Sequence, residues 1–436
     1  MSCEFNREQL APGVGFSRIW DPKFKQNRIS ACLILPLEKQ TVTQRALLPF
    51  LLRKGTKNCP DFTQLNRRLS QLYGAMLDAD VSKYGAYQVL CLTIQAVDDR
   101  FALEKEDIAQ QCAALLCEIL LQPNLENGEF PRQDVQLERE FLVDTIQSEI
   151  NDKRSYAVSQ CTQSLFEGTP FAVKKYGYAD AAKAITPQSA AQEYRKVLDS
   201  AAVEILFTGS GTAEGARRVF AQAFSRMDRH PVACVPAPVA PVRHQGYEFS
   251  EQMDVRQGKL VLGFRIAGEL TRRQKDATRM MCALFGGTPF SKLFLNVREK
   301  LSLCYYCAAR YDRSSGALLV DSGVEFANRQ SAQKEILAQL DAICRGEFTD
   351  EELGQTLLAM KNSLRTIGDS LGATESWYLT QILSGGDVIS AQQDIENLQE
   401  LGREDLIEAA QRLQLDSVYF LTGKSGEENA QPTQGV

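Results

Sequence analysis

The pattern of apolar positions divides the first half of the chain into an ordered series of strands and helices. Residues 28–37 are an apolar-rich run, including Ile29 and Leu33, that is typical of a buried strand. The next helix contains Pro49 and ends at Gly55, a residue type that often terminates helices. In order, the pattern predicts a strand at 28–37, helices at 44–53 and 61–72, strands at 75–82 and 87–95, helices at 108–119, 133–151 and 187–198, and a strand at 203–207.

The second half of the chain repeats this order. Thr271 is a predicted helix cap, and Thr349 with Glu352 forms a capping box. The pattern predicts strands at 260–266 and 416–423, helices at 271–285 and 336–344, and a further helix opened by the capping box. Residues 416–423 are similar to 199–209, and this self-similarity at a period a little over two hundred residues indicates duplication of one α/β unit.

The duplication predicts two domains joined by a connector. The first domain is expected at 1–228, a proline-rich linker at 229–250 and the second domain at 251–436. Two such halves would enclose a cleft, which is the usual place for a ligand.

Composition and charge exclude several classes of function. The chain has 436 residues, 44% of them apolar and 24% charged, with a net charge of -6, so no basic footprint for nucleic acid is expected. No apolar run approaches the ~18 residues that span a bilayer, and the first residues lack a signal peptide's apolar segment. We therefore expect a cytoplasmic protein without membrane insertion, whose twelve cysteines are reduced and mostly buried.

Histidine is too scarce for most catalytic sites. The chain has two histidines, His230 and His244, and both flank the proline-rich run. Since most zinc and general-base sites use histidine, this chain is a poor candidate for either. The close thiol pair Cys304 and Cys307 has no second such pair to complete a zinc site, and two strand thiols are the favoured interpretation.

The stretch 286–305 is expected to be a glycine turn, an amphipathic helix and the start of a strand. Leu293 and Val297 lie on one stripe of that helix. Arg298 and Tyr305 lie on either side of the helix-to-strand turn, so they could face one cleft. The alternative from spacing alone is a solvated arginine and a half-buried tyrosine.

These features resemble the M16 family of pitrilysin-like, inverted zinc-binding metallopeptidases. The matching pieces, in family order, are Leu52-Arg53-Lys54-Gly55-Thr56, the run 137–146, the strand 260–264, and the stretch from Gly286-Gly287 through Arg298-Glu299-Lys300 to Tyr305. The resemblance implies an α/β (α+β) fold of two homologous domains, each a mainly antiparallel sheet packed against helices, that face each other across a cleft.

The family's zinc motif is absent. Active members carry His-x-x-Glu-His on the helix that ends in Lys-Gly-Thr, where two imidazoles hold zinc and the glutamate takes a proton from bound water. Those three places fall here on Ala46, Pro49 and Phe50, none of which can bind zinc or accept a proton. The further glutamate ligand falls on Thr145, with Glu149 as another candidate.

The resemblance therefore implies a catalytically inactive, non-zinc subunit of a heterodimeric peptidase. Arg298 and Tyr305 would serve the site of a zinc-bearing M16 sister subunit, and Gly286 and Gly287 would bind substrate. Zinc is expected only in the partner, and this chain needs no cofactor. Ser302 stands where the family usually has glycine. A bacterial subtype with proline in the zinc helix is associated with 5-aminopentanol modification of elongation factor P, or with peptide maturation.

Two interpretations of the peptide site stay open. Extended peptide would pair with a strand edge near 76–82, as β-augmentation requires. Alternatively, that stretch is an ordinary edge strand, which Asp78, Asp80 and Lys83 protect from aggregation. The competing function is a scaffold or peptide-binding module with no part in catalysis, like the respiratory-complex core subunits that share this fold.

Overall fold

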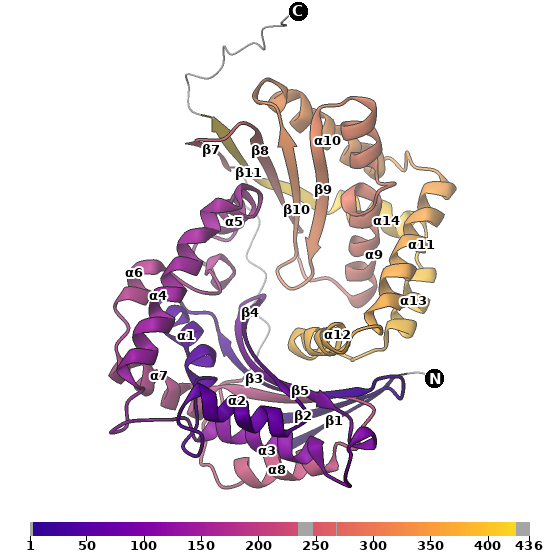
Figure 1. The fold of residues 1–436 in the computed structure, drawn as a ribbon. Coiled ribbons are helices and arrows are strands. Elements are labelled where there is room, and N and C mark those ends of the chain that lie inside the picture. The colour runs from indigo at the N-terminus through magenta and orange to yellow at the C-terminus, as the bar shows by residue number, and fades with distance from the viewer. Residues whose placement is uncertain (1–2, 234–246, 267, 424–436) are drawn as a thin grey trace, which may run out of the picture. The chain divides into compact units, whose positions relative to one another are not determined.

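The computed structural model describes residues 3–233, 247–266 and 268–423. The chain folds into two compact units (Figure 1). Unit 1 contains residues 1–148, 173–237 and 366–390, and unit 2 contains residues 149–172, 238–365 and 391–436. Each half of the chain thus supplies a segment to the unit built mainly by the other half. The predicted boundaries 1–228, 229–250 and 251–436 stay a prediction, because the linker residues 234–246 lie outside the described part.

Unit 1 is built on a six-stranded mixed sheet. Its strands are β1 (Glu4–Ala11), β2 (Val14–Trp20), β3 (Gln26–Pro36), β4 (Met76–Tyr84), β5 (Tyr87–Val97) and β6 (Ala202–Gly209). Their spatial order is β1-β2-β6-β3-β5-β4, in which β2 and β6 are parallel and the other neighbours are antiparallel. This confirms the prediction of a mainly antiparallel sheet, and it leaves β4 at an edge.

Helices cover both faces of this sheet because its strands are apolar on both sides. Leu33 and Ile205 face the larger core, while Ile34 and Leu206 face a second core that includes Leu379. Figure 1 shows α3 and α8 on one face and α12 on the other. The helices of unit 1 are α1 (Val42–Leu52), α2 (Phe62–Gln71), α3 (Ile108–Leu121), α4 (Arg132–Ser148), α6 (Ala179–Lys183), α7 (Pro187–Ser200), α8 (Glu214–Phe224) and α12 (Leu371–Ser384).

Unit 2 repeats the plan with a five-stranded mixed sheet. Its strands are β7 (Tyr247–Met253), β8 (Gly258–Ile266), β9 (Cys304–Asp312), β10 (Ala317–Val324) and β11 (Leu413–Gly423), in the order β7-β11-β8-β10-β9. Only the β7–β11 pairing is parallel among these described strands. Helix α5 (Lys153–Leu165) packs Ala157 and Cys161 against Val261 and Tyr419, on the face opposite α9 and α14 (Figure 1).

The remaining elements of unit 2 are mostly helical. They are α9 (Arg272–Cys282), the π-helical segments η4 (Ala283–Gly287) and η5 (Leu293–Lys300), α10 (Arg329–Cys344), α11 (Asp350–Ile367), α13 (Ala391–Gln399) and α14 (Arg403–Gln411). Short 3₁₀ turns of unit 2 are η2 (Glu149–Asn151), η3 (Pro170–Ala172) and η6 (Phe326–Asn328), and unit 1 has the turn η1 (Asp99–Phe101).

Local capping chemistry accounts for the helix starts that were predicted. The side chain of Thr271 accepts a hydrogen bond from the backbone N–H of Gln274, and Thr349 and Glu352 bond reciprocally. Strands β1, β2, β7 and β10 have no counterpart in the predicted series. β1 and β7 lie at sheet edges with mostly exposed residues, so their apolar signal is weak.

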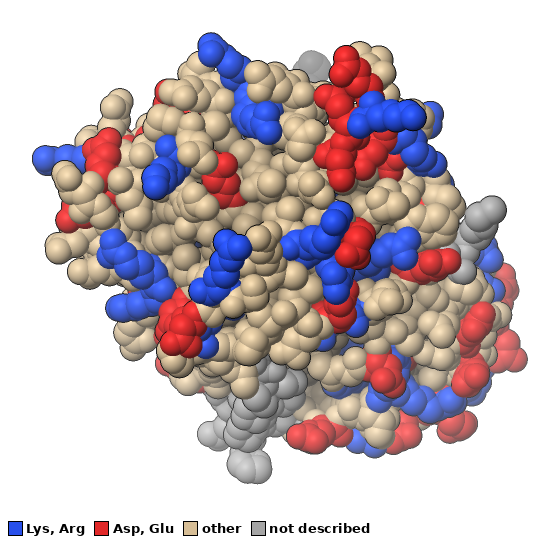
Figure 2. All heavy atoms as spheres, turned by 90° about the horizontal axis from the view of Figure 1, so that it is seen from below, with Lys and Arg blue, Asp and Glu red and all other residues tan. Residues whose placement is uncertain are grey.

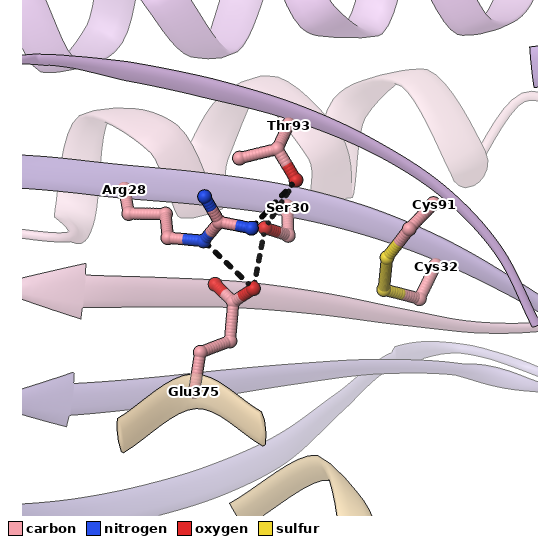
Figure 3. Close-up of a disulfide and its surroundings, with 6 residues drawn as sticks. All are labelled: Arg28, Ser30, Cys32, Cys91, Thr93 and Glu375. Carbon is pink, nitrogen blue, oxygen red and sulfur yellow. Dashed lines mark hydrogen bonds and ion pairs between the residues drawn. A yellow bond between two sulfur atoms is a disulfide. The ribbon is translucent and has the colours of Figure 1, made fainter. Parts of the chain in front are cut away.

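The exchanged helices α5 and α12 are each held to their sheet by an ion pair. On α5, Arg154 pairs with the buried Asp321 of β10. On α12, the buried Glu375 accepts hydrogen bonds from Arg28 at 3.0 Å and from the hydroxyl of Ser30 at 2.8 Å (Figure 3). Burial raises the pKa of Glu375, although Arg28 opposes the shift.

One cysteine pair corrects the prediction that all thiols are reduced. Cys32 of β3 and Cys91 of β5 are directly opposite each other in the ladder and form a disulfide, with Cα atoms 4.3 Å apart (Figure 3). The prediction is wrong for this pair because strand register, rather than sequence spacing, brings the two residues together across 59 positions.

Candidate functional site

Arg298 and Tyr305 line the same cavity of unit 2. This cavity has a volume of about 380 Å³. Its lining residues are Arg298, Glu299, Ser302, Leu303, Cys304, Tyr305, Glu325 and Asn328. The two side chains singled out from the sequence are therefore brought to one site, whereas their catalytic role stays a prediction.

The segment η5 fixes the position of Arg298. Leu293 and Val297 are fully buried and attach one side of the helix to the core, as the stripe predicted. Arg298 lies on the outer side, where 42% of its side chain is exposed. Its guanidinium lies 4.7 Å from the ring of Phe294, one turn earlier, and its Nε is 3.5 Å from a carboxylate oxygen of Glu299.

Ser302 makes the turn that leads from η5 into β9. The backbone N–H of Leu303 donates to the carbonyl of Val297 at 3.0 Å, and that of Ser302 donates to the carbonyl of Arg298 at 3.1 Å. The second bond, from the residue after the helix cap to the carbonyl four residues earlier, is that of the αL C-cap motif, which needs a left-handed residue and usually takes glycine. Ser302 adopts that conformation with a φ of 50°. Serine thus occupies a backbone position that favours glycine without abolishing the turn.

A β-bulge points Tyr305 out of the sheet. Gly323 of β10 pairs with Tyr306, but the next residue, Val324, pairs with Cys304, so Tyr305 is the extra residue. Tyr305 is 59% exposed, and its hydroxyl donates to a carboxylate oxygen of Glu325 at 3.2 Å. The alternative prediction of a half-buried strand tyrosine is therefore wrong, because the bulge changes the side-chain alternation.

The two predicted glycines lie at the end of η4 and are not among the residues that line this cavity. A Cβ atom on Gly286 would come within 2.7 Å of the backbone nitrogen of Ala309 on β9, so this position needs glycine for packing. Gly287 is exposed. The predicted glycine turn is a π-helical segment in the structure, and the substrate-binding role of both residues stays a prediction.

The zinc-motif positions of unit 1 belong largely to the hydrophobic core. Ala46 is fully buried and Pro49 is buried on α1. Phe50 is half-buried, with the guanidinium of Arg53 5.2 Å from its ring. None of these side chains has a metal-binding atom, so the residues present do not fit a zinc ion.

The positions proposed for the further zinc ligand show no such site either. Thr145 on α4 is half-buried and donates its hydroxyl to the carbonyl of Phe141 at 2.8 Å. Glu149 is in the 3₁₀ turn η2. Among the described residues, no group of three His, Cys, Asp or Glu side chains is arranged to hold a metal ion. His230 is exposed and bonds to Asp199, while His244 lies outside the described residues.

Unit 1 has a pocket of its own beside the edge strand β4. Its volume is about 810 Å³. Its lining residues come from the end of α1, from α2, from the strands and from α4: Arg28, Arg53, Lys54, Phe62, Leu65, Asn66, Leu69, Ala75, Met76, Leu77, Asp78, Thr93, Gln95 and Asp134. Lys54 pairs with the buried Glu138, which joins α1 to α4. The start of β4 thus borders a pocket of mixed polarity.

Three residues that line this cavity could not be assigned to it from the sequence, namely Glu325, Asn328 and Cys304. Glu325 and Asn328 follow β10, and only the β9–β10 register brings them beside Tyr305. Cys304 was considered as a metal ligand but not as part of this cavity wall. The sequence contains one signal for the bulge. Cys304 and Cys307 are three residues apart and both apolar in character, which breaks the strict apolar–polar alternation of a regular strand.

Charged side chains show no concentration of one sign on the face of the molecule in Figure 2. Lysine and arginine side chains are interspersed with aspartate and glutamate there. In the described part of the chain, no helix is long and apolar enough to cross a membrane.

The two-sheet fold, helix α1 without zinc ligands and the cavity that Arg298 and Tyr305 line fit one class of protein. The chain belongs to the M16 peptidase family. Residues 184–360 match the family model described as Peptidase M16 inactive domain. Along 93% of its length the chain is 31% identical to a protein of Bacillus subtilis, covering 94% of that protein, whose name is "Probable inactive metalloprotease YmfF".

Solved structures agree with this assignment. A crystal structure of a conserved protein from Enterococcus faecalis has a TM-score of 0.89 and 28% identity, covering 96% of this chain and 99% of that one. The crystal structure of a protease from Helicobacter pylori has a TM-score of 0.78 at 15% identity, covering 97% of this chain and 100% of that one, which shows the shared fold. The chain is thus an M16 homologue similar over nearly its whole length to a relative named as inactive.

Proposed function

We propose that this chain is the non-zinc subunit of a heterodimeric M16 peptidase, and that it supplies Arg298 and Tyr305 to the site of a zinc-bearing sister subunit. The observation that carries the proposal is a contrast within one chain. Arg298 and Tyr305 line one cavity, while Ala46 and Pro49, at the zinc-motif positions, are buried in the core. The chain thus has hydrogen-bond donors suited to peptide hydrolysis but lacks the zinc ligands that this reaction needs.

The chemistry of the pair suits a developing oxyanion. Attack on a peptide carbonyl puts negative charge on its oxygen, and Arg298 and Tyr305 would each donate a hydrogen bond to that oxygen. One preorganised donor of this kind contributes about 3 to 4 kcal/mol in other enzymes. For Tyr305 to donate there, its hydroxyl must leave Glu325, and the exposure of its side chain makes that rotation sterically feasible.

The substrate class we propose is an extended peptide. Strand β4 is at the edge of its sheet and can accept a further strand by main-chain hydrogen bonds. Met76 is 58% exposed, and with Leu77 and Asp78 it lines the unit 1 pocket, which could take peptide side chains. Asp78 and Asp80 also protect the edge from unwanted pairing, so the two interpretations of this strand are compatible.

The proposal is tested by mixing the chain with a zinc-bearing M16 sister from the same cell and measuring peptide hydrolysis. We expect Arg298→Ala and Tyr305→Phe each to lower kcat/KM by about 10²- to 10³-fold, as loss of one oxyanion donor does elsewhere. Arg310→Ala is the matched control, because Arg310 is an exposed residue of the same strand outside the cavity.

Size-exclusion chromatography checks that each variant still forms the complex. Unchanged hydrolysis with both variants in an intact complex would reject the shared site and favour a scaffold without a part in catalysis.

For the biological role we propose, from the resemblance alone, either 5-aminopentanol modification of elongation factor P or peptide maturation. The link to 5-aminopentanol modification of elongation factor P is tested by the intact mass of that factor from native cells with and without this chain. Loss of the modification in cells that lack the chain is the expected result, and an unchanged mass would leave peptide maturation as the role to test.

A further inference from the structure

We propose that Cys304 and Cys307 form a thiol modification site in the wall of the Arg298–Tyr305 cavity, where Cys304 exchanges with low-molecular-weight disulfides. The modification itself needs only this chain. Its consequence, the blocking of Arg298 and Tyr305, rests on the proposed function.

The bulge at Tyr305 creates the thiol pair. Residues three apart on a regular strand point to opposite faces, but the extra residue restores Cys304 and Cys307 to one side. Both are buried, with 8% and 5% of their surface exposed. Cys304 is among the residues that line the cavity and Cys307 is not, so Cys304 is the thiol of the pair that a small reagent in the cavity would meet.

The surroundings of Cys304 favour its thiolate. A hydrogen bond with Cys307 is the largest cause, and Ser322 and the positive charge of Arg298 act in the same direction. Together they outweigh the effect of burial and lower the pKa of Cys304 to about 7. The pKa of Cys307 is raised in turn, so Cys307 keeps its proton and donates it. At neutral pH, Cys304 is therefore the nucleophile of the pair.

The reaction is an ordinary thiol–disulfide exchange. The Cys304 thiolate attacks one sulfur of a disulfide RSSR, the S–S bond of RSSR breaks, and RS⁻ leaves. A mixed disulfide between Cys304 and R remains, and no other oxidant is needed. Because Cys307 keeps its proton, it is a poor nucleophile toward the mixed disulfide, which is therefore the expected end product.

The product would occupy the cavity that Arg298 and Tyr305 line. With glutathione as R, the added group carries carboxylates into a cavity of about 380 Å³ and competes for the guanidinium of Arg298. A reducing thiol would remove it again. The site would in this way couple the activity of the complex to the thiol redox state.

The experiment treats the purified full chain with glutathione disulfide at pH 7 and follows the modification of each cysteine by mass spectrometry of peptides. Cys344 is the internal comparison, because it is only partly buried and burial raises its pKa. We expect Cys304 to react at least about tenfold faster than Cys344, since far more of it is thiolate. Cys282, fully enclosed and with a pKa of about 12, should not react.

Two variants, with a third as control, make the assignment specific. Cys304→Ser should abolish the fast addition, and Cys307→Ser should slow it several-fold by removing the hydrogen bond that favours the thiolate. Cys344→Ser should leave it unchanged. Equal rates at Cys304 and Cys344, or a product two hydrogens lighter that joins Cys304 to Cys307, would overturn the proposal.

The consequence is measured separately in the mixed complex. Glutathione addition should lower peptide hydrolysis by wild type and spare the Cys304→Ser complex. If addition is fast but hydrolysis depends on neither Arg298 nor Tyr305, the proposed function fails while the modification site stands. If hydrolysis depends on both residues but Cys304 reacts slowly, the site fails and the function stands.

Discussion

Helix α1 of unit 1, which carries the zinc-motif positions, and the Arg298–Tyr305 cavity of unit 2 differ in how far their side chains are exposed. On α1, Ala46 and Pro49 are buried among apolar residues. In unit 2, Arg298 and Tyr305 are on the surface of a cavity, positioned by the left-handed turn at Ser302 and a bulge. The α1 positions therefore contribute to packing of the core, whereas the exposed side chains of Arg298 and Tyr305 are available to a ligand, as the proposed function requires.

The largest effect is expected when the three zinc-motif residues are introduced into α1. The triple variant Ala46→His, Pro49→Glu, Phe50→His restores the motif but places polar and charged groups in a core that has no partners for them. We expect the free energy of unfolding to fall by about 3 to 5 kcal/mol, measured by urea denaturation. We also expect no stoichiometric zinc by metal analysis, because Thr145 supplies no carboxylate and Glu149, the other candidate ligand, belongs to unit 2 whereas α1 belongs to unit 1.

Gln44→His is the control for this variant. Gln44 is a half-buried residue of the same helix, and its substitution should change the free energy of unfolding by about 0.5 kcal/mol or less. A triple variant that binds one zinc ion per chain at wild-type stability would show that α1 is still a preformed metal site.

A second prediction concerns the buried carboxyl of Glu375, which holds α12 to the sheet of unit 1. Burial raises the pKa of Glu375, so the folded state binds its proton more tightly than the unfolded state does. The stability due to Glu375 is therefore fully present below the unfolded pKa, near 4.5, and is lost as pH rises through the folded pKa. In Glu375→Gln, this part of the pH dependence of the free energy of unfolding should disappear.

Urea denaturation of wild type and Glu375→Gln from pH 4 to pH 8 measures this difference. Peptide hydrolysis by the mixed complex should not depend on Glu375, because Glu375 lines neither the Arg298–Tyr305 cavity nor the unit 1 pocket. Parallel stability curves for the two proteins would contradict the burial effect.

The smallest expected effect is at the turn beside the cavity. Ser302 adopts a positive φ, which glycine adopts without strain. Ser302→Gly should raise the free energy of unfolding by about 0.5 to 1 kcal/mol. Ser302→Ala keeps the Cβ atom and should not stabilise the protein. A destabilising Ser302→Gly would mean that the serine side chain, rather than the backbone conformation, supports the turn.

The sequence predicted those features that depend on neighbouring residues. The cap at Thr271, the buried stripe of Leu293 and Val297 and the α/β class follow from local chemistry and periodicity. The shared cavity of Arg298 and Tyr305 was expected as a possibility, because the residues flank one turn.

Features that depend on long-range register could not be predicted. The partnership of Tyr305 with Glu325, the disulfide between Cys32 and Cys91 and the exchange of α5 and α12 all require knowing which strand or helix packs on which. No periodicity within one segment carries that information.

The central claim is that Arg298 and Tyr305 act on one carbonyl oxygen, and a double-variant cycle tests it most directly. The kcat/KM of the mixed complex is measured with wild type, Arg298→Ala, Tyr305→Phe and the double variant, at equal concentrations of assembled complex. Two donors to one oxyanion are coupled, so the loss in the double variant should be clearly smaller than the product of the two single losses. Losses that multiply in full, or no loss in any variant, would contradict a shared site.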